Sequence, residues 1–410
     1  MQSKNDEIYT IADTEVTFEI SKSNEYNQKD LVILHKDGFS KYLEVNPMTL
    51  SVLYQLNSQK TFHEIFNQLI IDFKLSGSVD EIFVDFKQTA LFKYLFDTSS
   101  DFKATRGDKY IFPKLTILKK EWVRILSSPF AFLFNDKVFL TLLLVIPLIL
   151  VSFFVTYEIG LGNLYNYINA ENALTFYLGY LLCVLFHEIG HAASAIHYNT
   201  KPDNIGFGFY LISPVFYCDV SDIWRLNHKK RFRVDLAGIY FQWILSLGFI
   251  GVFLIRQQEF WLYFSFFNFV SSLLNLNPLL RYDGYWAVSD LLQVPNLRQK
   301  SFNELKSILK DLVRINFVKR PTKNYFVALY GLLSAAMIGS FLYFMVFINT
   351  DSILYFFQHF GNFWYKIFAE TATITFEFVK ESVISFLPPI IFYWLLFNFL
   401  KTRLKRWRNR

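Results

Sequence analysis

The feature that most constrains this 410-residue chain is a series of long apolar segments separated by short basic stretches. Hydrophobic residues make up 53% of the sequence and aromatic residues 20%, including 48 Phe. The first hundred residues are mixed and polar, so the apolar residues are concentrated in the remainder of the chain. An apolar segment of about 18 residues is long enough to cross the hydrocarbon core of a bilayer as a helix. We therefore expect a mainly α fold, a polytopic bundle of membrane helices, with a small α+β cytosolic domain at the N-terminus.

The hydropathy pattern predicts about six spans. Their orientation follows from the basic stretches 224–233, 314–323 and 401–410, because Lys and Arg are retained on the cytoplasmic side. The sequence thus predicts a multi-pass protein of the cell membrane with both termini in the cytoplasm. The net charge of +6 reflects this topology, and we expect no nucleic-acid partner, since the basic runs lie beside membrane ends. The expected spans are 137–157, 173–196, 235–255, 260–280, 325–348 and 383–400, and an aromatic element at 352–370 could lie on the outer surface.

The second expected span contains the sequence HEIGH, which places His187 and His191 four residues apart with Glu188 beside the first. Residues four apart share one face of a helix, so two imidazoles could occupy two corners of a tetrahedral Zn²⁺ site. Glu188 could then act as a general base on a water at the metal. A chance match or a buried structural pair is the alternative, although ionisable residues within membrane helices are rare and usually functional. Gly190 and the small residues after it would permit close helix packing.

Two histidines leave a catalytic zinc short of a protein ligand, because such sites usually have three. Asp283 is one candidate for the third. It follows Pro278, which should end the fourth expected span, and it precedes Gly284. An Asp before a Gly is also a common turn residue. The rival candidates are polar residues between the second and third spans: His197, Asp219, Asp222 and His228.

These two stretches together resemble the site-2 protease family of intramembrane zinc metallopeptidases. The first is HExxH at 187–191, and the second is the family's N-x-x-P-x-x-x-x-D-G at 275–284. The resemblance covers roughly residues 130–300. It implies that Asp283 is the third zinc ligand beside His187 and His191, that Glu188 is catalytic, and that Asn275 helps to hold the substrate.

One departure from the family lies between these motifs. The family commonly has G-P-x-x-N, whereas this chain has Gly238-Ile239-Tyr240-Phe241-Gln242. The Gln242 amide could donate a hydrogen bond to a developing oxyanion, or it could simply bond within the bundle. The stretches 206–222 and 281–298 resemble the peptide zinc metalloprotease branch, many of whose members accompany bacterial peptide maturation or export systems.

The N-terminal region shows strand-like stretches over 30–47 and helical patterns over 48–73 and 79–96, where Thr61 and Glu64 form a capping box. This pattern resembles the PqqD-like fold, a small winged-helix domain that binds the leader of a precursor peptide. A domain that only stabilises or regulates the membrane part is the alternative. The expected organisation is a PqqD-like domain at 1–100, a basic interfacial connector at 101–136, the zinc metalloprotease core at 137–300, and a cytosolic loop with C-terminal spans at 301–410.

The implied function is zinc-dependent hydrolysis of a peptide bond in a small precursor peptide or a membrane-associated substrate. The expected partners are that peptide, the lipid bilayer, and a peptide exporter or modifying enzyme. The stretch 205–217 could form a re-entrant hairpin or edge strand that pairs with an extended substrate, or an ordinary cytoplasmic loop. A di-iron desaturase is excluded because the seven histidines are too few and too scattered. A non-catalytic scaffold that passes a peptide to a transporter is the remaining alternative.

Overall fold

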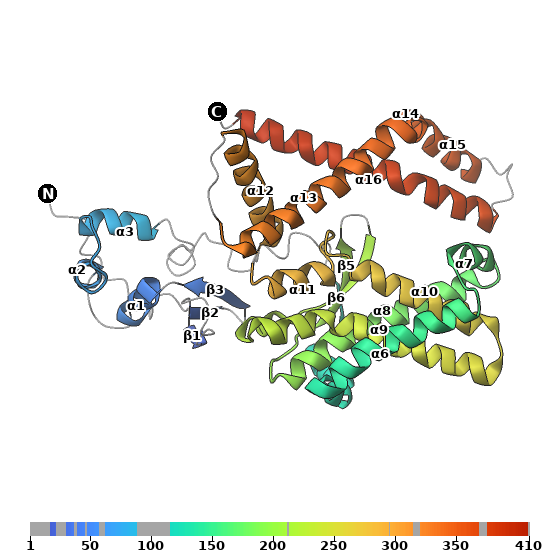
Figure 1. Cartoon of the computed structure of the whole chain (residues 1–410), viewed down its shortest axis with the longest axis horizontal. Helices are drawn as coiled ribbons and strands as arrows, with labels where there is room; N and C mark the ends of the chain where they lie inside the picture. The colour runs from blue at the N-terminus through green and yellow to red at the C-terminus, as the bar shows by residue number, and fades with distance from the viewer. Residues whose placement is uncertain are drawn as a thin grey trace. The chain divides into compact units, whose positions relative to one another are not determined.

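The structure, a computed structural model, describes residues 17–21, 30–36, 39–45, 47–56, 62–87, 115–210, 213–294, 296–314, 320–368 and 375–408. The chain forms two compact units. Figure 1 labels the helices and strands and colours them along the chain. Unit 1 comprises Met1–Pro129 and Ala195–Arg231, and unit 2 comprises Phe130–Ser194 and Phe232–Arg410. The chain is mainly helical, with small antiparallel sheets in unit 1.

The N-terminal part of unit 1 begins with an antiparallel sheet in the order β1-β2-β3. Three helices follow, and they pack around a core in which the Phe66 ring contacts those of Phe83 and Phe86. The expected strand pair and helices are present, and β1 is an additional strand that the sequence pattern did not predict. Residues 88–96 and the Thr61 cap lie outside the described part of the chain. The elements are β1 (Thr17–Ser21), β2 (Asp30–Lys36), β3 (Phe39–Val45), α1 (Pro47–Leu56), α2 (Phe62–Phe73) and α3 (Val79–Lys87).

A second sheet of unit 1 joins segments that are far apart in the sequence. β5 (Ile205–Tyr210) and β6 (Ser213–Cys218) form a hairpin, one of the two alternatives that the sequence left open, and β4 (Leu115–Leu118) pairs antiparallel with the other edge of β5. Residues 115–118 of the expected connector 101–136 thus form a strand that the sequence pattern did not predict, and the interfacial position of the connector stays a prediction. The alternating Leu-Thr-Ile-Leu sequence is short, and its strand character depends on the distant partner. After β4 come α5 (Lys120–Ser127) and η3 (Ser128–Phe134), and after β6 comes η4 (Ser221–Arg225).

Unit 2 is a helical bundle. Five helices in the described residues are long and apolar enough to cross a membrane: Asp136–Thr156, Ala173–His197, His228–Arg256, Thr322–Ile348 and Phe376–Phe397. They coincide with five of the six expected spans. The remaining segment, expected over 260–280, is a helix of only 17 residues that ends at Asn275, because a turn containing Pro278 follows it. The elements are α6 (Asp136–Thr156), α7 (Leu161–Tyr167), α8 (Ala173–His197), α9 (His228–Arg256), α10 (Glu259–Asn275), α11 (Asp283–Leu291), α12 (Leu297–Val313), α13 (Thr322–Tyr343), η5 (Phe344–Ile348), α14 (Thr350–Leu354), α15 (Phe356–Phe368) and α16 (Phe376–Arg408).

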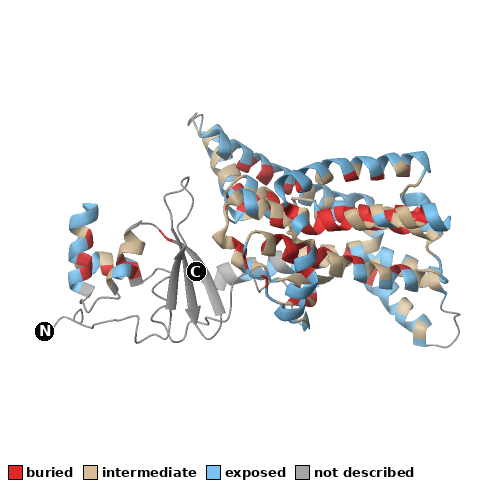
Figure 2. Cartoon of the chain, turned by 90° about the horizontal axis from the view of Figure 1, so that it is seen from below, coloured by how far each residue is buried: buried red, intermediate tan, exposed pale blue. Residues whose placement is uncertain are grey.

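Helix α9 is the most enclosed of the five long apolar helices. In its most apolar 18-residue window 50% of the residues are buried, against 6% in α16. Figure 2 shows the same contrast between helices rich in buried residues and helices whose faces are mostly exposed. The Phe241 ring of α9 contacts Phe186 of α8 and stacks on Phe134. At the start of the bundle, Arg233 of α9 forms an ion pair with Asp136 of α6. These contacts make α9 the element around which α6 and α8 pack.

Helices α9 and α10 form a tight antiparallel hairpin held by buried polar groups. Asn268 of α10 donates to the Gln242 carbonyl at 2.8 Å and to the Ser246 hydroxyl at 2.9 Å. Its side-chain oxygen accepts from the Gln242 amide at 3.2 Å. Two further bonds join the hairpin, from the Ser265 hydroxyl to the Ser246 carbonyl and from the Trp243 indole to Ser272. Buried polar groups need such partners, so α10 is fixed in register along α9.

Replacing Asn268 with Leu should destabilise this hairpin. The substitution removes three hydrogen bonds and leaves the buried Gln242 amide and Ser246 hydroxyl without those partners. An unsatisfied buried group costs about 1–3 kcal/mol, so we expect a loss of roughly 2–5 kcal/mol. Thermal unfolding in detergent measures it, with Asn303→Leu on an exposed face of α12 as the control. Equal unfolding temperatures for the two variants would contradict the described network.

Candidate metal centre

Three side chains of unit 2 converge on one point. His187 and His191 lie one turn apart on α8, and Asp283 is the first residue of α11. The Asp283 Oδ2 atom lies 2.8 Å from His187 Nε2 and 3.5 Å from His191 Nε2. The two Nε2 atoms are 3.1 Å apart. The histidines are 4% and 7% exposed and thus nearly enclosed by protein, whereas the Asp283 side chain is 22% exposed.

The other ring nitrogen of each histidine is bonded to an oxygen of α9. His187 Nδ1 lies 2.9 Å from Gln242 Oε1, and His191 Nδ1 lies 2.7 Å from the Val234 carbonyl oxygen. A carbonyl oxygen can only accept, so each Nδ1 carries the proton and donates it. In the neutral imidazole the Nε2 atom then presents a lone pair. Outer contacts of this type orient metal-binding histidines and raise their basicity.

The three inner atoms fit a small cation. Two imidazole lone pairs and a carboxylate oxygen at these separations repel one another unless positive charge lies among them. A tetrahedral ion about 2.0–2.1 Å from each ligand separates its ligand atoms by roughly 3.3 Å, which is close to the observed 2.8, 3.1 and 3.5 Å. In the described part of the chain, these three residues form the one such group of His, Cys, Asp or Glu side chains.

Glycine at position 238 leaves space for the His187 ring. A Cβ atom at Gly238 would lie 2.3 Å from His187 Nε2, well inside van der Waals contact. Gly190 on α8 likewise lies against the Ala237 carbonyl, which confirms the close packing expected from its size. The contacts from α9 come from Val234, Gly238 and Gln242, which are spaced by four residues and therefore share one face of the helix.

The Gln242 amide is engaged at both ends. Its oxygen accepts from His187, and its nitrogen donates to Asn268 of α10 at 3.2 Å. Gln242 and Asn268 are both fully buried. The structure therefore shows the bundle-bonding alternative for Gln242, in which the side chain orients a histidine, and the oxyanion role stays a prediction.

Asp283 reaches the histidines from a break in the helical structure. α10 ends at Asn275, and α11 starts at Asp283 after a turn in which Asn277 Oδ1 accepts from the Leu279 backbone N–H at 2.9 Å. A Cβ atom at Gly284 would lie 2.0 Å from the Leu276 carbonyl, so the Asp-Gly pair permits this close return of the chain.

The remaining candidate residues take different positions. Glu188 is 7% exposed beside His187 on α8, and Asn275 is half-buried at the end of α10, where its substrate role stays a prediction. The rival ligands Asp219 and Asp222 bond elsewhere, to Ser221 and to Arg225. His197 and His228 lie at the ends of α8 and α9, outside the metal group. The contacts from Val234, Gly238 and Asn268 were not expected, although four-residue spacing along 234–242 is a signal that could have identified the first two.

Comparisons of the chain with models of protein families, with curated proteins and with solved structures found no match.

Replacing Gly238 with Ala should weaken metal binding, because the new Cβ would displace the His187 ring. We expect a loss of affinity of about 10–100-fold, the range seen when the shell around metal ligands is disturbed. Competition with a chromophoric chelator measures it. The matched control is Gly248→Ala on the same helix, where an added Cβ meets nothing within 4 Å. If both variants bound metal as tightly as the wild type, the position of His187 would be wrong.

Replacing Gln242 with Met should also weaken metal binding, because the buried His187 Nδ1–H would lose its acceptor at similar side-chain volume. Gln242→Glu keeps an acceptor and should retain most of the affinity. The expected loss for Gln242→Met is again about 10–100-fold, measured by the same competition. The control is Gln299→Met on an exposed part of α12. Equal affinities for Gln242→Met and the control would show that the amide does not orient the ligand.

Proposed function

We propose that the chain is a membrane-embedded zinc metallopeptidase that resembles the site-2 protease family. The observation that supports this most strongly is the convergence of His187, His191 and Asp283 next to Glu188. Two imidazoles and one carboxylate are a common protein ligand set for catalytic zinc. This set joins two stretches of the chain that match both motifs of the family.

Zinc bound by these three residues would polarise a peptide carbonyl and acidify a water molecule. The protein's own groups supply the rest of the chemistry. Gln242 and the Val234 carbonyl hold the imidazoles with Nε2 directed at the site, and Asp283 balances positive charge there. The Glu188 carboxylate takes a proton from the attacking water and then gives it to the nitrogen of the departing amine. These roles are those of a peptide hydrolase.

The proposed setting is the cell membrane, with both termini in the cytoplasm. Five apolar helices support a multi-pass protein, but an odd number of crossings would put the termini on opposite sides. We propose that α10 supplies the sixth crossing. Its 17 residues extend about 26 Å, somewhat less than the roughly 30 Å of a bilayer core, and it runs back along α9. The turn after it then brings Asp283 toward the cytoplasmic end.

The substrate we propose is a small precursor peptide or a membrane-associated protein, processed in a bacterial maturation or export system. The three strands and three helices of residues 17–87 support a PqqD-like domain that captures a segment of the precursor. The hairpin β5–β6 offers a strand to which an extended peptide could add. An exporter or modifying enzyme would be the functional partner.

The test is Glu188→Gln, which should keep the metal and lose cleavage. Removing a general base typically costs about 10²–10⁴-fold in rate. Cells that express the wild type should yield new peptide N-termini, identified by terminal labelling and mass spectrometry, which cells that express Glu188→Gln lack. Glu259→Gln at the exposed start of α10 is the control. Metal bound by Glu188→Gln together with an unchanged set of cleaved peptides would disprove the peptidase and favour the non-catalytic scaffold.

A further inference from the structure

The break between α10 and α11 carries Asp283, so the position of this break determines where the carboxylate lies. A break frees backbone groups that a continuous helix would have paired, and these groups need other partners when they are buried. Pro278 increases the number of backbone groups that need other partners, because it has no N–H and cannot continue the helix. Some are satisfied locally: the Leu279 N–H donates to Asn277 Oδ1, and the Tyr282 carbonyl accepts from the Tyr285 N–H.

Two carbonyls of the break are held by helices that come later in the chain. The Tyr330 hydroxyl of α13 donates to the Pro278 carbonyl at 2.8 Å. The Arg298 guanidinium of α12 donates to the adjacent Leu279 carbonyl. Two consecutive residues of the break are thus bonded by side chains of later helices. Tyr330 lies outside residues 130–300, the region that resembles the family, and Arg298 lies at the end of that region.

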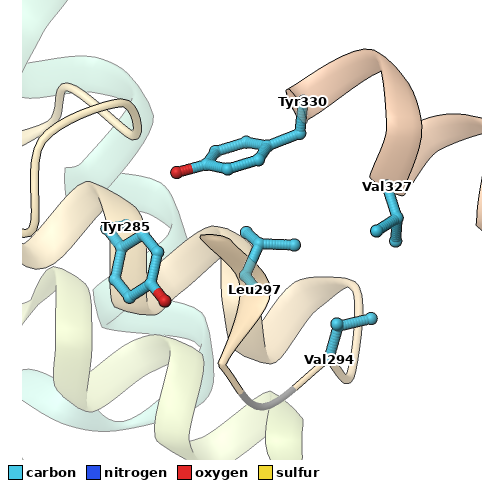
Figure 3. Packing of buried hydrophobic residues seen from close by; sticks show 5 residues of the cluster. All are labelled: Tyr285, Val294, Leu297, Val327 and Tyr330. Carbon is cyan, nitrogen blue, oxygen red and sulfur yellow. The ribbon is translucent and has the colours of Figure 1, made fainter. Parts of the chain in front are cut away.

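An apolar cluster supports the same contact. Tyr285 of α11 packs with Val294 and Leu297 and with Val327 and Tyr330 of α13, and all five are buried. Figure 3 shows the Tyr330 side chain extending from its helix toward Tyr285 and Leu297. Tyr285 lies two residues after Asp283, so this cluster fixes the first turn of α11 while the two hydrogen bonds fix the residues before it.

Helices α12 and α13 are themselves tied together. The Arg320 guanidinium, just before α13, bonds Glu304 and Ser307 and pairs with Asp311, all on α12. The relative position of Arg298 and Tyr330 is therefore maintained by contacts independent of the break. A hairpin that is rigid in this way can hold the break in one position.

We propose that the α12–α13 hairpin acts as a clamp that positions Asp283 for metal binding, with Tyr330 and Arg298 as its positioning residues. The proposal rests on one part of the proposed function, namely that Asp283 is the third metal ligand. The histidines are held by α9, whereas the carboxylate is held by the C-terminal helices. The affinity of the site for zinc then depends on side chains that never touch the metal.

The first test measures Zn²⁺ binding by the purified full chain in detergent, by competition with a chromophoric chelator. Tyr330→Phe and Arg298→Gln each remove one hydrogen bond to the break and should weaken binding about 10-fold, the lower end of the range for outer contacts. The matched controls are Tyr325→Phe on α13 and Arg314→Gln at the end of α12, both at exposed positions, and these should bind as the wild type does.

Cobalt gives a readout that a general loss of stability would not produce. The visible absorption of bound Co²⁺ depends on the number and arrangement of its ligands. The Tyr330→Phe and Arg298→Gln proteins at saturating Co²⁺ should show a spectrum shifted toward that of Asp283→Asn, whereas the controls should keep the wild-type spectrum. Wild-type spectra and affinities for both clamp variants, together with weakened binding by Asp283→Asn, would overturn the clamp and leave the metal site intact. If the wild type bound no more zinc than His187→Ala, both the clamp and the proposed function would be wrong.

A second measurement uses the wild type alone and so does not depend on whether a variant folds. Coupling between two sites is reciprocal, so zinc should stabilise the clamp as the clamp stabilises zinc binding. Amide hydrogen exchange in α12 and in the first half of α13 should therefore slow when zinc is added to chelator-treated protein. Exchange in α16, which holds no residue of the clamp, is the internal control. Unchanged exchange in α12 and α13 at saturating zinc would contradict the proposal.

Discussion

His187 and His191 reach their hydrogen-bond acceptors because α8 lies directly against one face of α9. Gly238 makes this approach possible, since any side chain there would occupy the volume of the His187 ring. The same face supplies the Val234 carbonyl and the Gln242 amide, which set the proton on each Nδ1. The close contact between two helices therefore decides both where the imidazoles lie and which nitrogen is available. The other contacts of the site depend on this packing of α8 against α9.

The environment explains why the polar groups are linked into a network. In an apolar bundle an unpaired amide or hydroxyl is costly, and this favours hydrogen bonds between the buried polar side chains. The Gln242 amide bonds His187 at one end and Asn268 at the other, and Asn268 in turn bonds Ser246. Helix α10 thereby contributes to the position of His187, a candidate ligand that α10 does not touch. The polar interior of the hairpin joins the two helices and also supports the candidate metal centre.

Asp283, the third candidate ligand, has a different kind of support. A continuous helix would carry Asp283 past the site, whereas the turn around Pro278 brings it back, and non-helical backbone is tolerated there because its carbonyls are bonded by Tyr330 and Arg298. The two histidines are held by α9, and the Asp283 carboxylate is held by a separate turn. The site is therefore assembled by tertiary contacts. Side chains of the C-terminal helices thus bond the turn that carries Asp283.

Features that depend on local spacing along the chain could be predicted before the fold was known. Apolar run length predicted five of the long helices, and the four-residue interval placed His187 and His191 on one face. For the third ligand the residues alone left Asp283 among several rivals, and only the folded chain brought it to the histidines. The tertiary structure also decided the roles of Val234, Gly238 and Asn268, the pairing of 115–118 with 205–207, and the hold of Tyr330 on Pro278. Periodicity in the sequence shows which residues share a face of one helix or strand. Contacts between distant segments depend instead on how the helices and strands pack, and this packing leaves no regular pattern along the chain.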